Sequence, residues 1–206
     1  LPASELAHKK VLDIGCRRGR GVYKISAMVG DGGEAWGVDW NRAYVAESKD
    51  GQDRAWHDSG LKHDNMDFRW AFPEDLIEAG IGNEVFDVVY VNNVMTLFYD
   101  QEQAIREMSR VLRPGGLLIM ETIFASEARP QEVIDAARAI GNSVQAARTQ
   151  EENLAWLAAA GFGEPSIEDS YEVAANQGYK AGQTVPTVED AEGVSYRAVS
   201  MYIYKS

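Results

Sequence analysis

Short apolar runs alternate with longer amphipathic segments through the first part of the chain. Each run has the length of a strand, and each segment after it has the length of a helix. This alternation predicts βαβ units and a parallel sheet. The predicted strand and helix pairs are 10–14 with 22–29, 35–39 with 43–57, and 67–71 with 74–79.

The middle of the chain continues the same pattern. A fourth apolar run at 86–91 lacks polar alternation, which is typical of a central strand covered on both faces. Apolar residues then recur at helical spacing over 103–112, and the Arg-Pro-Gly-Gly sequence at 113–116 stops that helix. A fifth strand is predicted at 117–122, with helices at 126–140 and 151–160 after it.

The tail has a different pattern. The segments 166–173 and 195–204 read as strands with no helix between them, so they are predicted to pair antiparallel. The loop that joins them, about twenty residues long, exceeds the usual connection and is therefore either mobile or functional.

Composition and charge narrow the possible functions. The chain has 206 residues and a formal net charge of −12, which suits one domain and disfavours nucleic acid and anionic membranes as partners. Cys16 is the only cysteine, which excludes an internal disulfide and a cysteine-cluster metal site. There is no apolar run of about 20 residues and no signal-peptide pattern, so we expect a cytoplasmic protein.

A strand that runs into a glycine-bearing turn is the main chemical signal. Gly15 and Gly19 lie between the first strand and the first helix, where glycine lets the backbone take unusual angles and approach a ligand. Asp13 can hold an ammonium group or order the turn. Asp39 ends the second strand, where its carboxylate can accept hydrogen bonds from both hydroxyls of a ribose.

The turn alone leaves several interpretations open. Glycine-rich turns of this kind also serve NAD, FAD and purely structural needs. However, Gly15, Gly19 and Gly21 do not have the Gly-x-Gly-x-x-Gly spacing of the dinucleotide fingerprint. A nicotinamide-dependent oxidoreductase is therefore disfavoured.

Taken together, four features resemble class I S-adenosylmethionine-dependent methyltransferases. They are Asp13-x-Gly15-x-x-x-Gly19, Asp39, the stretch 84–89 and the segment 111–117 around Leu-Arg-Pro-Gly-Gly. The resemblance implies an α/β fold, a Rossmann-like three-layer sandwich with a mostly parallel seven-stranded sheet and an antiparallel C-terminal hairpin. It also implies a single methyltransferase domain over 1–206, with a cofactor-binding half at 1–123 and C-terminal helices and the hairpin at 124–206.

The resemblance further implies S-adenosylmethionine as the cofactor and a small molecule as the methyl acceptor. The turn would hold the methionine part, Asp39 the ribose, and Trp40 with the 72–74 loop the adenine. The predicted cofactor-binding residues are Asp13, Gly15, Cys16, Arg17, Gly19, Asp39, Trp40, Phe72, Pro73, Glu74 and Asn92. No catalytic residue and no metal ligand is predicted, because methyl transfer depends largely on positioning.

Two positions depart from the family pattern. Arg17 replaces the middle glycine of the usual motif, and Pro73 has no N–H to give to the adenine ring. Glu74 can still accept from the exocyclic amine, and Phe72 can pack on the ring. We therefore expect a methyltransferase for an unidentified small molecule, with a non-catalytic binding or scaffold protein on the same fold as the alternative.

Within the family, the chain most resembles the arsenite-methyltransferase-like branch, through Gly-Val-Tyr at 21–23, Glu-Asp-Leu at 74–76, Val-Asn-Asn-Val at 91–94 and the ending at 196–204. That branch carries cysteines where Asn93 and Asn142 stand here. Trivalent arsenic needs soft thiolate ligands, so arsenite methylation is not expected. Five tyrosines are candidates for the wall of an acceptor pocket: Tyr171, Tyr179, Tyr196, Tyr202 and Tyr204.

Overall fold

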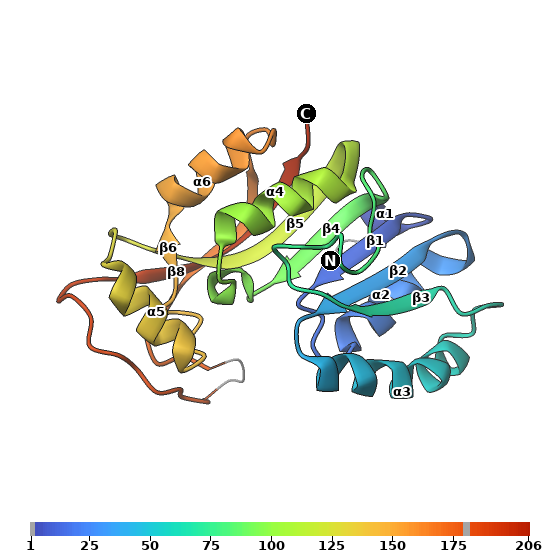
Figure 1. The fold of residues 1–206 in the computed structure, drawn as a ribbon, viewed down its shortest axis with the longest axis horizontal. Coiled ribbons are helices and arrows are strands. Elements are labelled where there is room, and N and C mark those ends of the chain that lie inside the picture. The colour runs from blue at the N-terminus through green and yellow to red at the C-terminus, as the bar shows by residue number, and fades with distance from the viewer. Residues whose placement is uncertain (1–2, 179–181) are drawn as a thin grey trace.

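The computed structural model describes residues 3–178 and 182–206. One mixed sheet runs through the molecule in the order β3-β2-β1-β4-β5-β8-β7, and β6 pairs with β5 beside this path (Figure 1). The strands are β1 Lys10–Ile14, β2 Glu34–Asp39, β3 Met66–Trp70, β4 Phe86–Asn92, β5 Leu112–Ala125, β6 Arg148–Thr149, β7 Ser166–Val173 and β8 Tyr196–Tyr204. The helices are α1 Ala3–Leu6, α2 Arg20–Val29, α3 Arg42–Ser59, α4 Gln101–Val111, α5 Gln131–Ala139 and α6 Gln150–Ala159, with 3-10 turns at Gly30–Gly32 and Met95–Leu97.

The sheet confirms the predicted fold class. β1 to β5 pair with their neighbours in parallel, and β8 pairs antiparallel with both β5 and β7. The seven strands of the main path were all predicted. The eighth strand, β6, was not, because its two residues are too short to show a pattern of alternation.

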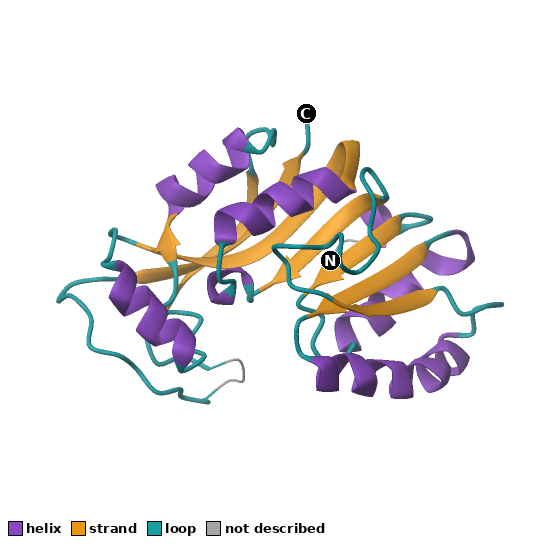
Figure 2. Cartoon of the chain, viewed as in Figure 1, coloured by secondary structure: helices purple, strands orange, loops and turns teal. Residues whose placement is uncertain are grey.

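Helices cover the sheet on both faces (Figure 2). On one face, α2 packs on β2 and α3 on β3; the core there includes Val11, Val22 and Ile25. On the other face, α4 packs on β5, and the core includes Leu12 and Ile105. Neighbouring residues of β1 thus belong to different cores, because successive side chains of a strand point to opposite faces.

The helix predicted at 74–79 is absent, and this prediction was wrong. The N–H of Leu76 donates to the carboxylate of Glu107 at 2.8 Å, and the carbonyl of Ala79 accepts from Arg69 at 2.9 Å. A helix over 74–79 would leave both of these backbone groups without a partner inside the helix, and side chains distant in sequence bind them in the turns that form instead. Local spacing could not reveal these partners.

Two other boundaries differ from prediction. The helix expected over 126–140 begins only at Gln131, directly after Pro130. Proline is tolerated at the start of a helix but not in its interior. The Arg-Pro-Gly-Gly sequence at 113–116 does end α4. It forms a bulge inside β5 instead of a separate loop. Phe86 pairs with Leu112 and Val88 pairs with Leu117, so residues 113–116 are extra residues between two paired positions.

Because β1, β2, β4 and β5 are parallel, their carboxyl ends lie at one edge of the sheet. The predicted site residues lie at or just after the carboxyl ends of β1, β2 and β4 and after that of the parallel strand β3. Among the described residues, no helix is both long enough and apolar enough to cross a membrane.

Candidate cofactor and acceptor site

The turn after β1 has room only for glycine at two positions. Gly15 has φ +78, and a Cβ there would lie 2.6 Å from Cγ2 of Val94. Gly19 has φ +75, and a Cβ there would lie 2.9 Å from Oγ of Ser48. Both the angles and the contacts disfavour any side chain. The backbone of the turn therefore lies close to Val94, which follows β4, and to Ser48 of α3.

Arg17 keeps the left-handed angle that glycine would adopt, with φ +51. Its N–H donates to Oδ2 of Asp39 at 2.8 Å. Arg17 therefore has a backbone angle that glycine adopts easily, and a left-handed arginine carries backbone strain.

Asp39 fixes the turn against the end of β2. Its Oδ1 accepts from the N–H of Asn41 at 2.8 Å, while Oδ2 accepts from Arg17. Burial raises the pKa of the Asp39 carboxyl, and the two N–H groups and the Arg17 charge oppose that rise. Each carboxylate oxygen has two lone pairs, so these two hydrogen bonds leave acceptor capacity for a ligand's hydroxyl groups.

Asp13 is a buried carboxyl without a side-chain hydrogen bond to any residue in the described ranges. It is 4% exposed. Burial raises the pKa of Asp13 to about 7, with further upward contributions from the negative charges of Asp39 and Glu121. A carboxylate in this position is stabilised by an added positive charge, as an ammonium group would supply.

An aromatic cavity of about 140 Å³ lies beside the turn. Trp40 forms one wall and meets Phe98 edge to face, with ring centroids 5.7 Å apart. The missing Cβ of Gly15 would lie 3.5 Å from the Trp40 ring, so the cavity adjoins the turn. The lining residues are Trp40, Phe72, Pro73, Glu74, Leu97, Phe98 and Tyr99.

Four residues predicted to surround the adenine therefore lie together in this cavity. Glu74 uses Oε1 to accept from the N–H of Asp100 at 3.1 Å, and its second oxygen accepts no hydrogen bond from the residues that the structure describes. Phe72 is 47% exposed and packs edge to face on Trp70. Cys16 differs from the other predicted residues, because its side chain is buried beside Gly37 in the core and only its backbone belongs to the turn.

The end of β4 brings Asn92, which was predicted, and Asn93 close to Glu121 of β5, which was not predicted. The N–H of Asn93 donates to the carbonyl of Glu121 at 2.7 Å, and the Asn93 amide donates to Oδ1 of Asn92 at 3.0 Å. The hydroxyl of Tyr90 donates to Oε1 of Glu121 at 3.1 Å. Burial and then the charges of Glu121 and Asp13 raise the pKa of Tyr90, which keeps Tyr90 a donor. The only sequence signal for Glu121 is that an acidic residue follows the apolar run at 117–120.

Two adjoining cavities open next to Asn93. The outer cavity, about 220 Å³, is lined by Asn93, Glu121, Asp169, Tyr171, Ala198, Val199 and Ser200. The inner chamber, about 120 Å³, includes Asn93, Ile123, Ser143, Val144, Tyr171, Val173, Val185 and Ala198 in its lining. Of the five candidate tyrosines, Tyr171 lines both spaces, Tyr196 packs against Arg129 instead, and Tyr179 lies outside the described residues.

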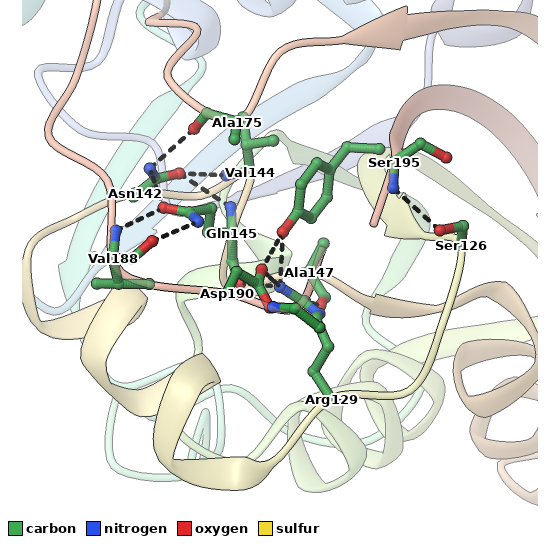
Figure 3. A network of polar contacts seen from close by, with 12 residues as sticks. Ser126, Arg129, Asn142, Val144, Gln145, Ala147, Ala175, Val188, Asp190 and Ser195 are labelled. Atoms are coloured by element: carbon green, nitrogen blue, oxygen red, sulfur yellow. Dashed lines mark hydrogen bonds and ion pairs between the residues drawn. The ribbon is translucent and has the colours of Figure 1, made fainter. Parts of the chain in front are cut away.

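Asn142, at the second position of the expected cysteine pair, is fully buried (Figure 3). Its amide nitrogen donates to the carbonyls of Ala175 and Pro186, each at 2.9 Å. Its Oδ1 accepts from the N–H groups of Val144 and Gln145. Asn142 therefore holds backbone segments together and does not face either cavity.

Comparisons with known proteins agree with this geometry. Residues 5–161 match the family model of a methyltransferase domain. Arsenite methyltransferase from Homo sapiens is 34% identical over 123 residues, which are 60% of this chain and 33% of that protein. Arsenite methyltransferase from Mus musculus is 33% identical over 128 residues, 62% of this chain and 34% of that protein. The chain thus spans about a third of the length of these curated relatives.

A solved structure has the same fold. The arsenic(III) S-adenosylmethionine methyltransferase from Chlamydomonas reinhardtii superposes with a TM-score of 0.83 and 24% identity, covering 100% of this chain and 66% of that one. The chain belongs to the methyltransferase domain family, and over the compared stretch it is similar to arsenite methyltransferases.

Proposed function

We propose that this chain transfers a methyl group from S-adenosylmethionine to a nitrogen or oxygen atom of a small molecule other than arsenite. The observation that carries the proposal is the aromatic cavity beside a turn in which Gly15 leaves no room for a Cβ. A flat ring and a chain bearing an ammonium group fit these adjoining spaces. Asp13, a buried carboxyl at the end of β1, lies two residues before Gly15.

The residues present fit the cofactor. Trp40 and Phe72 would pack on the adenine, and Glu74 would accept from its amine. Asp39 would accept from the ribose hydroxyls, and Asp13 would pair with the ammonium group. When bound, S-adenosylmethionine supplies a methyl group on a positively charged sulfur. Negative charge from Asp13 and Glu121 would stabilise that cation and hold the methionine part in place.

Proximity is the main contribution that the chain's own residues make to the reaction. Asn93 and Glu121 line the outer cavity, where they would orient the acceptor atom. In the transfer, a lone pair on the acceptor forms the bond to the methyl carbon, and the electron pair of the carbon–sulfur bond stays on sulfur. The acceptor's proton leaves to water, directly or by way of the Glu121 carboxylate.

Arsenite is disfavoured as the acceptor on chemical grounds. The one thiol of the chain, Cys16, is buried, and burial raises its pKa. Asn93 and Asn142 are hard amides where soft thiolates would be needed. Asn142 is also enclosed by its own hydrogen bonds.

Calorimetric titration tests the proposal. S-adenosylmethionine and its demethylated product should bind with a Kd on the order of micromolar, equivalent to about −8 kcal/mol. Gly15→Ala should bind neither, whereas Gly30→Ala, where a Cβ would meet open space, should bind both. Labelled methyl groups should then reach an acceptor in a metabolite pool but not arsenite. An absence of heat with both compounds would remove the proposal.

A non-catalytic protein on the same fold is the second candidate, favoured by Arg17 in the turn and by Pro73 at the adenine cavity. It predicts cofactor binding without transfer to any acceptor. Measured transfer to a metabolite would exclude it. The cytoplasmic location, the small-molecule partner and the single domain over 1–206 remain predictions from the sequence.

A further inference from the structure

Polar side chains form a row across the sheet, from the cofactor turn to the outer cavity. Asp13 of β1 lies opposite Tyr90 of β4, and the hydroxyl of Tyr90 donates to Oε1 of Glu121 on β5 at 3.1 Å. Glu121 lies opposite Ser200 of β8, and Ser200 lies opposite Asp169 of β7. Because residues paired across neighbouring strands point to the same face of a sheet, the row connects the proposed cofactor site with the proposed acceptor site.

The outer cavity carries negative charge and no positive charge. Glu121 and Asp169 line it, and none of its lining residues is a lysine, an arginine or a histidine. Neither carboxylate forms an ion pair with another residue in the ranges that the structure describes. Asp13 is buried and close enough to Glu121 for the negative charge of Glu121 to raise the pKa of Asp13. Two unpaired carboxylates therefore attract a cation into the cavity.

Tyr90 holds one of these carboxylates in place. Its side chain is buried in the core, and its hydroxyl donates to Oε1 of Glu121. Burial and then the charges of Glu121 and Asp13 raise the pKa of Tyr90, so the phenol keeps its proton. The other oxygen of Glu121 accepts no hydrogen bond from the described residues. Glu121 is thus oriented by one oxygen and has the other available to a ligand.

The charge of the cavity distinguishes between the acceptor atoms that the proposed function leaves open. A protonated amine is attracted by both carboxylates, whereas an alcohol has no charge and a carboxylate or phosphate group is repelled. An amine must also lose a proton before its lone pair is free, and the Glu121 carboxylate can accept that proton. Nitrogen is therefore the acceptor atom that the cavity favours.

We propose that the methyl acceptor is a primary or secondary amine that binds in the outer cavity as its ammonium ion, with Glu121 as the residue that selects it and takes its proton. Tyr90 is a positioning residue that orients Glu121. This inference rests on the proposed function, because it takes the outer cavity as the acceptor site.

The transfer is balanced with these residues alone. One N–H proton of the ammonium ion passes to Glu121, and the freed lone pair forms the nitrogen–carbon bond. The electron pair of the carbon–sulfur bond stays on sulfur. Glu121 then releases the proton to water, and the product is the methylated ammonium ion.

Labelling of a metabolite pool sorted by charge tests the proposal. The pool is separated by ion exchange at neutral pH into cationic, neutral and anionic fractions, and each fraction is incubated with the full chain and labelled S-adenosylmethionine. The label should enter the cationic fraction at least about tenfold faster than either of the others, a difference of about 1.4 kcal/mol. Mass spectrometry of the labelled product should place the methyl group on nitrogen.

Three matched probes measure binding without turnover. Butylamine, butanol and butyrate have the same carbon chain and differ in charge, and each is added to the protein saturated with the demethylated cofactor. Butylamine should raise Tm more than butanol does at the same concentration, and butyrate should not raise it. A shift with butylamine no larger than the shift with butanol would overturn the proposal.

Two variants each remove one charge and keep the shape of the side chain. Glu121→Gln should lower kcat/KM for the cationic fraction by about a hundredfold. Asp169→Asn should raise KM severalfold with little change in kcat, and it keeps the test available if the first variant does not fold. Glu172→Gln is the matched control and should leave both constants unchanged, because Glu172 is an exposed acid of β7 outside the lining of the outer cavity.

Tyr90→Phe separates a positioning role from a role in stability. Phenylalanine keeps the ring in the core and removes only the hydroxyl that holds Glu121. With the carboxylate still charged but no longer oriented, kcat should fall about tenfold while KM for the amine changes little. A lower Tm with kcat unchanged would show that Tyr90 has a structural role alone.

The outcomes separate the two proposals. Transfer to the neutral or anionic fraction, or undiminished transfer by Glu121→Gln to the cationic fraction, overturns the amine inference and leaves the methyltransferase proposal intact. Cofactor binding without transfer to any fraction overturns both in favour of the non-catalytic candidate. No heat with S-adenosylmethionine or its product also overturns both.

Discussion

Replacing Arg17 with glycine tests whether the unusual residue in the turn costs stability or binding. Arg17 has φ +51, and an L-residue in the left-handed region is disfavoured by about 1–2 kcal/mol. Glycine removes that strain but loses about 0.5–1 kcal/mol because the unfolded chain becomes more flexible. The net gain for Arg17→Gly is therefore between zero and about 1.5 kcal/mol.

In a chain of this length, 1 kcal/mol corresponds to a change in Tm of about 2–4 °C. The hydrogen bond from the N–H of Arg17 to Asp39 involves the backbone, so glycine keeps it. We expect Tm of Arg17→Gly to rise by up to about 6 °C in differential scanning calorimetry. The Kd for the demethylated cofactor should change by less than about tenfold, or 1.4 kcal/mol.

Two control variants separate backbone from side chain. Arg17→Ala removes the guanidinium group but keeps the strained Cβ, so it should not raise Tm. Glu84→Gly relieves a similar angle, φ +56, in an exposed turn far from the site in sequence, and should raise Tm as Arg17→Gly does. A fall in Tm for Arg17→Gly alongside a rise for Glu84→Gly would refute the strain argument. If both Arg17 variants bind cofactor much more tightly, the arginine side chain obstructs the site.

Three further predictions concern Gly15 in the turn, the buried Asp13 carboxyl, and the ion pair between Arg129 and Asp190. Gly15→Ala should lower Tm and abolish cofactor binding, since its Cβ would lie 2.6 Å from Val94, whereas Tm of Gly30→Ala should fall less in the same thermal scan. The pKa of Asp13 is raised from 3.8 to about 7, so its contribution to the free energy of unfolding is present below about pH 4 and is lost as pH rises through 7. Asp13→Asn should flatten this decline when unfolding by urea is measured over the same pH range. A pH profile unchanged from that of the natural chain would contradict the raised pKa. Asp190→Asn leaves Arg129 buried without its counter-charge and should lower the free energy of unfolding by about 3–5 kcal/mol in denaturant titrations. Asp135→Asn is the control and should lower it by about 0–1 kcal/mol, because Asp135 in its ion pair with Arg138 is half exposed. Equal losses would show that burial does not decide the effect.

The sequence predicted the sheet well because the pattern of each main strand can be recognised from neighbouring residues alone. The unbroken apolar run of β4 and the alternation of strands with helices need no distant partner to be recognised. The segment 74–79 shows where this fails. Its residues have helical spacing, but Glu107 and Arg69 bind its backbone groups, and neither contact can be read from the segment itself.

For the candidate site too, residues in local motifs were predicted, and residues brought together by distant segments were not. Gly15, Arg17, Asp39 and Trp40 were predicted from motif positions, and the structure places them around one turn. Glu121 and Asp169 were not predicted, because β5 and β7 bring them to one cavity only through β8. The hydrogen bonds of Asn142 likewise depend on segments more than 30 positions away. A local motif can identify the cofactor turn, but the acceptor wall is a product of the tertiary fold.

The buried position of Cys16 has a practical consequence for experiments. Its thiol lies in the core beside Gly37, and burial raises its pKa, so maleimide dyes should not label the native protein. A cysteine introduced on the surface would then be the single reactive thiol. Fluorophores or spin labels could be attached there without first removing the natural residue, and movements of the chain during turnover could be followed by spectroscopy.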